Sequence, residues 1–215
     1  QEAGGGGGGG EELIEADFVV VTLPLGVLKA NSVEFVPPLP QEKLRAIAAI
    51  GMGVENKVIL RFSEVFWPAN EPYIQTLHPH LRFLNGDYFG KERTLIVHMS
   101  PPLSYTHDTD TQVVELVVKT LEKMFGRSLL DLVTDSIVTR WDKDEFSKGS
   151  YSYMAVGATV RDIIALAAPC HEERIFWAGE ACSVEGQQCV HGAYITGQEA
   201  AGKILEALEQ IEEKN

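Results

Sequence analysis

Cysteine and long apolar runs are scarce in this chain of 215 residues, and each shortage excludes a class of protein. The cysteines, Cys170, Cys182 and Cys189, are too few and too scattered to form a disulfide framework, which favours a reducing, intracellular compartment. No apolar run approaches the ~20 residues that span a bilayer, and no basic-then-apolar leader opens the chain. A membrane partner is therefore not expected, and the cytoplasm, the peroxisome and the nucleus are not distinguished.

Basic residues are also in short supply, with 18 lysines and arginines against 31 acidic residues. The formal net charge is −13, whereas nucleic-acid backbones select basic surfaces, so no direct contact with nucleic acid is expected. An acidic field attracts cationic substrates and raises their encounter rate. The alternative is that the acidity serves solubility alone.

A dinucleotide-binding unit is missing as well. Such a unit has a strand, then Gly-x-Gly-x-x-Gly, then an acidic residue about twenty positions on. Residues 4–10 are all glycine, but no strand pattern precedes them and no helix pattern follows, so they are interpreted as a loop or linker. His78 and His80 are too isolated to indicate a metal site, and no metal is expected.

The patterns that are present alternate between strand and helix. Residues 18–23 form a continuous apolar run, typical of a strand buried on both faces, whereas residues 56–62 alternate as a half-buried strand does. Apolar spacing predicts helices at 41–50, 109–125 and 189–210, and further strands are expected near 73–77, 81–84, 94–99, 133–141 and 175–178. In the helix at 41–50, Leu44, Ile47 and Ala48 mark the apolar face, and Gly51 is the expected C-cap. The chain is thus expected to belong to the α/β class.

The stretch at 176–200 carries the strongest signal for a site. An apolar strand stops at Gly179 and Glu180, a loop follows, and a helix rich in small residues begins near Cys189. A helix start directs free backbone N–H groups at a ligand, glycine allows close approach, and a carboxylate accepts hydrogen bonds from ligand hydroxyls. The layout predicts a cofactor floor, with an ordinary strand-loop-helix unit as the alternative.

These residues resemble the flavin-dependent amine oxidases, which include polyamine oxidases, lysine-specific histone demethylases and monoamine oxidases. The Gly-Glu pair followed by Val-His-Gly-Ala-Tyr looks like the C-terminal flavin-binding motif of that family. The likeness recurs in the family's order at 16–29, 35–40, 56–58, 66–67 and 139–153, and it extends from about residue 16 to 208.

The resemblance implies a fold with two parts. Residues 1–28, with the glycine-rich loop, and residues 170–215 would belong to a Rossmann-like FAD-binding domain, of which 170–215 is the C-terminal part. Residues 29–169 would form an α+β substrate-binding domain. The N-terminal half that grips the phosphates of FAD would be missing from this chain.

The resemblance also implies an FAD-dependent amine oxidase. A cationic amine such as a polyamine would lose a hydride to the flavin, and O2 as electron acceptor would give H2O2 together with an imine or aldehyde. One alternative is a histone methyl-lysine demethylase of the same family. Another is a truncated, non-catalytic fragment that lacks the N-terminal dinucleotide motif.

Lys57 is the catalytic residue that the resemblance implies. In the family, the lysine of the Asn-Lys-Val motif holds a water close to the reactive nitrogen of the flavin, and Asn56, Lys57 and Val58 keep that motif intact. Without the family likeness, a lysine on a strand is usually just exposed. The expected flavin contacts are Thr22, Pro24, Trp141, Ser150, Tyr151, Gly179, Glu180, Cys189 and Val190.

Three residues are expected at the substrate. Tyr151 resembles one wall of the family's aromatic cage, whose π face attracts a cationic amine. Cys189 stands where monoamine and many polyamine oxidases have tyrosine, which points away from the monoamine oxidases. Phe146 replaces a second tryptophan of the chromatin-type enzymes, which keeps apolar packing but removes an indole hydrogen bond.

Overall fold

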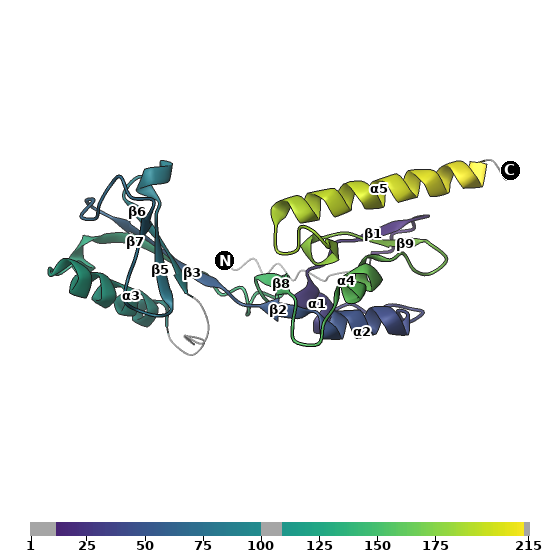
Figure 1. Ribbon diagram of the computed structural model, residues 1–215, viewed down its shortest axis with the longest axis horizontal. Helices are drawn as coiled ribbons and strands as arrows, with labels where there is room; N and C mark the ends of the chain where they lie inside the picture. Colours follow the sequence, from purple (N-terminus) through teal and green to yellow (C-terminus); the bar gives the residue numbers. More distant parts are fainter. Residues whose placement is uncertain (1–11, 100–108, 213–215) are drawn as a thin grey trace, which may run out of the picture.

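The computed structural model describes residues 12–99 and 109–212, which form two lobes (Figure 1). One lobe holds a five-stranded sheet and one long helix, and the other holds two small sheets and the remaining α-helices. The chain passes from one lobe to the other between β2 (Gly51–Gly53) and β3 (Asn56–Phe62) and returns between β7 (Val133–Val138) and β8 (Tyr151–Tyr153). The segments that carry Lys57 and Trp141 therefore lie at the junction of the lobes.

The first lobe is built on an antiparallel sheet with the strand order β4-β5-β6-β3-β7. Val58, Leu60 and Phe62 on one face of β3 are buried with Val117 and Leu121 of α3, which confirms the predicted alternation at 56–62. The elements of this lobe are β3 (Asn56–Phe62), β4 (Tyr73–Ile74), β5 (Leu81–Asn85), η1 (Asp87–Phe89), β6 (Thr94–Met99), α3 (Asp110–Phe125), η2 (Leu130–Leu132) and β7 (Val133–Val138).

Local signals fix both ends of α3. The Thr109 side chain accepts a hydrogen bond from the Gln112 amide, and the Gln112 side chain accepts one from the Thr109 amide, which makes a reciprocal capping box. The helix ends at Gly126, whose φ of 66° suits glycine. The helix predicted at 109–125 is thus confirmed, with Thr109 as its cap.

The second lobe pairs strands from distant parts of the sequence. β1 (Val19–Val21) lies parallel to β9 (Ile175–Trp177), and β2 (Gly51–Gly53) lies antiparallel to β8 (Tyr151–Tyr153). Around them lie α1 (Leu25–Lys29), α2 (Gln41–Ala49), α4 (Val160–Ala167), η3 (Glu180–Cys182) and α5 (Val190–Glu212). No helix within residues 12–99 and 109–212 is both long and apolar enough to cross a membrane.

Two apolar clusters hold this second lobe together. The larger cluster joins Val21 and Trp177 of the parallel strands to Ile47 of α2 and Ile163 of α4. A smaller cluster, which includes Phe176, Ala178 and Ala200, packs α5 against β9. The larger cluster therefore draws on residues inside the range 29–169, and the domain boundaries at 28 and 170 stay a prediction.

Three local expectations were wrong. Val19 and Val20 of β1 are 49% and 39% exposed, so this strand is not buried on both faces; β9 is its one partner strand in the described part of the chain. In α2, Leu44 and Ala48 are exposed, and the buried face consists of Lys43, Ala46 and Ile47. That face turns toward α4, and Ile50 rather than Gly51 caps the helix.

Candidate functional site

A cavity of about 350 Å³ opens at the carboxyl ends of the parallel strands β1 and β9. Residues 21–25 and 177–182, which end and follow these strands, line it, together with parts of the segment 141–150 and Ala193 of α5. The crevice beyond the carboxyl ends of parallel strands is where open α/β sheets bind their ligands. The position of the cavity therefore marks it as the candidate site.

The cavity brings together residues that are far apart in the sequence. Six of the residues predicted to contact flavin line it, namely Thr22, Pro24, Trp141, Ser150, Gly179 and Glu180. Trp141 remains 42% exposed, so one surface of its indole is open to a ligand. The residues come from the end of β1, from the segment that returns between the lobes, and from the loop after β9.

The other predicted site residues do not line this cavity. Lys57 and Tyr151 are half-buried on β3 and β8, whereas Cys189 is exposed just before α5. Val190 is 89% exposed and Phe146 is 73% exposed. Their proposed contacts with flavin or substrate stay predictions.

Gly179 has a backbone that only glycine adopts readily. Its φ is 141°, and a β-carbon built there meets no atom within 4 Å, so the space in front of it is open to a ligand. Thr196 of α5 fixes this turn, because its buried hydroxyl accepts a hydrogen bond from the Gly179 amide at 3.0 Å. The one proton of that hydroxyl has the carbonyls of Gly192, Ala193 and Gly179 within reach, at 2.9, 3.1 and 3.1 Å. The glycine is thus held in place by the helix behind it.

Glu180 has a structural task in addition to its place in the cavity wall. Its carboxylate accepts hydrogen bonds from the Ser152 amide at 2.9 Å, the Ser152 hydroxyl at 2.7 Å and the Gln188 amide at 2.7 Å. These contacts tie β8 and the loop before α5 to the cavity. A carboxylate has about four acceptor positions, so one remains for a ligand hydroxyl.

Trp177 supplies the observation that tests whether the cavity suits a flavin. The side chain is 4% exposed and lines the cavity, yet its indole Nε1 has no hydrogen-bond partner in the described structure. A buried donor without a partner costs about 1–3 kcal/mol, which an acceptor on a ligand removes. Together with the indole of Trp141, this wall fits a flat, acceptor-rich ring such as that of a flavin.

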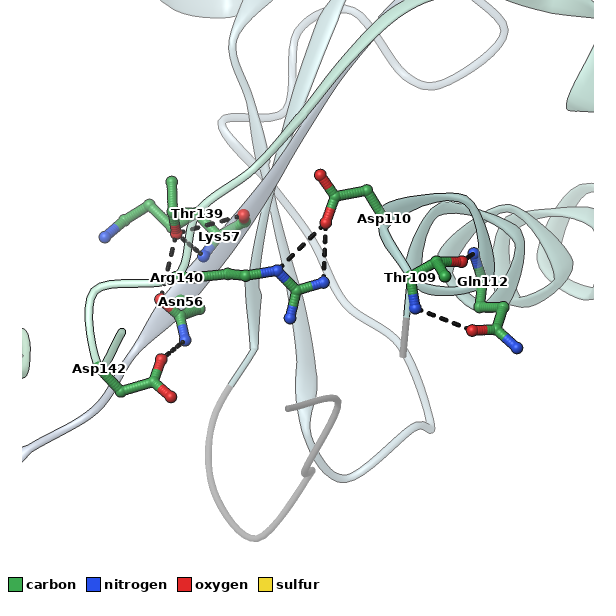
Figure 2. Close-up of polar contacts among 8 residues, drawn as sticks. All are labelled: Asn56, Lys57, Thr109, Asp110, Gln112, Thr139, Arg140 and Asp142. Carbon is green, nitrogen blue, oxygen red and sulfur yellow. Dashed lines mark hydrogen bonds and ion pairs between the residues drawn. The ribbon is translucent and has the colours of Figure 1, made fainter. Parts of the chain in front are cut away.

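Asn56 joins Lys57 to the segment that carries Trp141 (Figure 2). Its buried side chain donates to Asp142 Oδ1 at 2.9 Å and accepts from the Trp141 amide at 2.8 Å. The Thr139 hydroxyl lies 3.4 Å from Asn56 Oδ1 and accepts from the Lys57 amide at 2.7 Å. The strand that bears Lys57 and the cavity wall at Trp141 are therefore fixed to each other.

The same segment is anchored to α3 (Figure 2). Arg140 Nε and Nη2 donate to Asp110 Oδ1 at 3.1 and 2.7 Å, and Asp110 is the first residue of that helix. A carboxylate in the first turn also suits the positive end of the helix dipole. The residue before Trp141 is thereby held to the first lobe.

Lys43 is the most deeply buried charge behind the cavity. Its Nζ donates to the carbonyls of Ala165, Leu166 and Ala168 at 3.0, 2.6 and 2.7 Å, at the C-terminal end of α4. It also lies 4.3 Å from the centre of the Trp177 ring. Burial lowers the pKa of Lys43 to about 8, and burial raises the pKa of the neighbouring Cys182 thiol to about 11.

The fold and the cavity define an α/β protein with a candidate ligand site at the carboxyl ends of two parallel strands. A family model described as "Flavin containing amine oxidoreductase" matches residues 6–205. The chain belongs to this family, whose cofactor is a flavin.

Two curated relatives illustrate the match. The protein named Lysine-specific histone demethylase 1 homolog 3 of Arabidopsis thaliana is 36% identical over 202 residues, which cover 89% of this chain and 12% of that protein. Polyamine oxidase 4 of Oryza sativa subsp. japonica is 36% identical over 203 residues, which cover 86% of this chain and 38% of that protein. This chain therefore spans well under half the length of either relative.

Solved structures share the fold. Cyclohexylamine oxidase from Brevibacterium oxydans IH-35A superposes with a TM-score of 0.77 at 24% identity, over 93% of this chain and 45% of that one. A putrescine oxidase with a redesigned cofactor site gives a TM-score of 0.75 at 18% identity, over 89% of this chain and 43% of that one. The α/β fold expected from the sequence is thus confirmed.

Three residues of the site escaped the sequence-based prediction. Trp177 follows Phe176 in the predicted strand, and alternation places the two on opposite faces without telling which face meets a ligand. The sequence marks Asn56 only as part of the lysine motif, and Thr196 only as a residue of the last helix. Their partners, such as Asp142 at 86 positions from Asn56, lie too far along the chain for any local pattern to reveal.

Proposed function

We propose that this chain forms part of an FAD-dependent enzyme that oxidises an amine at the carbon next to nitrogen. The observation that carries the proposal is the convergence of Thr22, Trp141, Ser150 and Glu180 on the cavity at the ends of β1 and β9. The product is an imine, which water hydrolyses to an aldehyde, and O2 takes the electrons to give H2O2. The bound flavin supplies the two-electron redox chemistry, and the protein supplies position and charge.

The cavity residues divide the work of holding the cofactor. Trp141 offers an apolar wall for the ring, and the Trp177 N–H offers it a donor. Thr22 and Glu180 would offer polar contacts to the cofactor, and the open space at Gly179 would let it approach the backbone closely. The start of α5 near Cys189 and Val190 adds the partial positive charge of a helix N-terminus.

Lys57 would act on water. It lies on β3, and Thr139 and Asn56 link its backbone to the Trp141 segment. An ammonium on this strand would orient a water for imine hydrolysis or for reoxidation by O2. Tyr151, Phe146 and Cys189 would border the amine, with the Tyr151 ring attracting its positive charge.

Cofactor binding and substrate binding would fall to different domains of the two-part fold that the sequence predicts. Residues 1–28 and 170–215 would complete the FAD-binding domain, and residues 29–169 would form the substrate-binding domain. The net charge of −13 favours a cationic substrate such as a polyamine. A methyl-lysine peptide is the second candidate, because a relative named as a histone demethylase and one named as a polyamine oxidase are equally similar, at 36% identity.

The test uses the full-length protein, purified and loaded with FAD. Under anaerobic conditions it is mixed with spermine, an acetylated polyamine or a methyl-lysine peptide, while the visible absorption of the oxidised flavin is followed. We expect one class of amine to bleach the flavin and air to release H2O2. An enzyme that binds no FAD, or that none of these amines reduces, would contradict the proposal.

Lys57→Met separates the role of the lysine from that of the fold. We expect it to slow flavin reduction or reoxidation at least tenfold, on the scale of a lost positioned proton or water contact. Lys119→Met is the matched control, because Lys119 lies on α3 with its side chain 68% exposed. Equal turnover in the two variants would remove Lys57 from the mechanism.

A further inference from the structure

A carboxylate–imidazole pair lies beside the strand that carries Lys57. Glu55 Oε1 is 2.8 Å from His98 Nδ1, and the two side chains are 25% and 30% exposed. A carboxylate accepts hydrogen bonds but cannot donate one, so this contact selects the form of His98 with a proton on Nδ1. In the neutral imidazole, the lone pair then resides on Nε2.

The sheet register sets this pair against Lys57. In the antiparallel pairing of β3 with β6, His98 is the direct partner of Lys57. Residues directly opposite on antiparallel strands have their β-carbons about 4.5–5.5 Å apart on the same face. This face is the one turned away from the core, since Val58 and Leu60 occupy the buried face of β3.

The same pair is also tied to the cavity wall. The Ser150 hydroxyl lies 2.9 Å from the Glu55 amide, from which it accepts, and 3.1 Å from the Glu55 carbonyl, to which it donates. Ser150 lines the cavity at the ends of β1 and β9. Glu55 therefore links the proposed flavin site to the sheet face that holds Lys57 and His98.

The substrate ammonium has to lose a proton before its carbon can give up a hydride. Alkyl amines are protonated at neutral pH, with a pKa near that of a lysine side chain, about 10.4, and an ammonium has no lone pair to stabilise the carbon that loses hydride. Lys57 as an ammonium cannot accept that proton. A neutral imidazole held by a carboxylate can.

We propose that His98, oriented by Glu55, accepts the proton of the substrate ammonium, which rests on the proposed function as an amine oxidase. The N–H bond of the substrate breaks, an Nε2–H bond forms on His98, and the electron pair stays on the amine nitrogen. Glu55 stabilises the resulting imidazolium through Nδ1–H. The proton then leaves to solvent, to which the His98 side chain is 30% exposed, and no electron is transferred in this step.

Three charged groups set the electrostatics of His98. Glu55 contacts it from the segment before β3, Lys57 faces it from β3, and Arg82 is its direct partner on β5. The carboxylate thus offsets part of the cationic row of Lys57 and Arg82. When the amine hands its proton to His98, the positive charge moves to the imidazole, where the Glu55 carboxylate at 2.8 Å balances it against Lys57 and Arg82.

The kinetic test measures flavin reduction against pH by stopped flow in the full-length holoenzyme with spermine, or with whichever amine reduces it. His98→Gln should slow reduction at neutral pH about 100-fold or more, the usual size of a lost acid–base catalyst. Above the pKa of the amine, the substrate arrives already neutral, and the variant should return to within a few-fold of wild type. Glu55→Gln should show the same pattern with a smaller loss.

His80→Gln is the matched control, because it makes the same substitution at a histidine outside this pair, and it should keep the wild-type profile. A His98→Gln enzyme that is slowed equally at every pH, or not at all, would overturn the proton-acceptor role while leaving amine oxidation intact. A wild-type flavin that no amine reduces would overturn both proposals.

A second readout does not depend on turnover. In full-length apoprotein with 15N-labelled histidine, the ring nitrogens of His98 should report a protonated Nδ1 and a bare Nε2 in the neutral form. The opposite tautomer would contradict the proposal, because Nε2 would then have no lone pair to offer.

Discussion

At the residue scale, Lys43 is a buried charge whose contribution to the free energy of unfolding depends on pH. The unfolded chain holds the lysine proton with a pKa of about 10.4, whereas burial lowers the pKa in the folded protein to about 8. Between these two values the unfolded state binds more protons, so this group makes the free energy of unfolding rise with pH. Below that window, the buried ammonium is a constant penalty, offset by its three carbonyl contacts.

We expect Lys43→Met to remove this rise. Between about pH 8 and 10.5, the wild type should gain about 2 kcal/mol of unfolding free energy relative to the variant. Urea unfolding followed by tryptophan fluorescence at a series of pH values measures the difference. Lys119→Met, at an exposed site, controls for the general effect of losing a lysine. If the unfolding free energy of the wild type and of Lys43→Met changed with pH in parallel, the Lys43 ammonium would not be the source of the rise.

At the element scale, the segment between β7 and β8 is held by side chains rather than by regular structure. Asn56 contacts it at Trp141 and Asp142, and Arg140 anchors it to α3 (Figure 2). The segment supplies Trp141 and Ser150 to the cavity. Its order therefore decides whether the cofactor wall is in place.

Exchanging the partners of the Asn56–Asp142 contact tests this arrangement. Asn56→Asp sets two carboxylates against each other at a contact of 2.9 Å, and should cost about 1–3 kcal/mol. Asn56→Asp combined with Asp142→Asn restores one donor and one acceptor, and should recover most of the loss. Urea unfolding and the rate of proteolytic cleavage within 139–150 measure both effects. A double variant no better than Asn56→Asp would contradict the role of this contact.

The sequence predicts the helices and strands that have a strong hydrophobic periodicity. It does not predict those whose position depends on contacts with distant parts of the chain. The alternation at 56–62 and the apolar stripe at 109–125 predicted β3 and α3. α4 was overlooked, although Thr159 and Asp162 form a capping box at its start. The face of α2 was wrong because its buried position is a lysine, which no hydrophobic pattern marks.

The candidate site divides in the same way. The likeness to a family predicts Thr22 and Trp141, whereas the strand-loop-helix pattern at 176–200 predicts Glu180 by itself, and all three line the cavity. Trp177 belongs to none of the motifs that the family likeness marks. It stands out only because its buried indole N–H has no hydrogen-bond partner in the described structure, which the sequence does not show. His98 became visible only when the strand register placed it opposite Lys57.

At the scale of the whole molecule, each lobe has a core of its own (Figure 1). Leu121 of α3 is fully buried in the core of the five-stranded lobe, and Ile163 of α4 is 1% exposed in the core of the other. The two clusters share no residue, and two crossing segments with their hydrogen bonds connect the lobes in the part of the chain that the structure describes. Such an arrangement allows one lobe to open while the other stays folded.

Alanine substitutions in the two cores should therefore have separate effects. Leu121→Ala and Ile163→Ala should each cost about 2–5 kcal/mol by leaving a cavity. In hydrogen exchange followed by mass spectrometry, Leu121→Ala should reduce protection in β3, β6 and α3, and Ile163→Ala in α2, α4 and β9. Because the cavity is lined almost wholly by the second lobe, Ile163→Ala should also weaken flavin binding more than Leu121→Ala does. If either substitution instead lowered protection across both lobes to the same extent, the molecule would have to be treated as one cooperative unit, with Asn56 and its partners transmitting the loss.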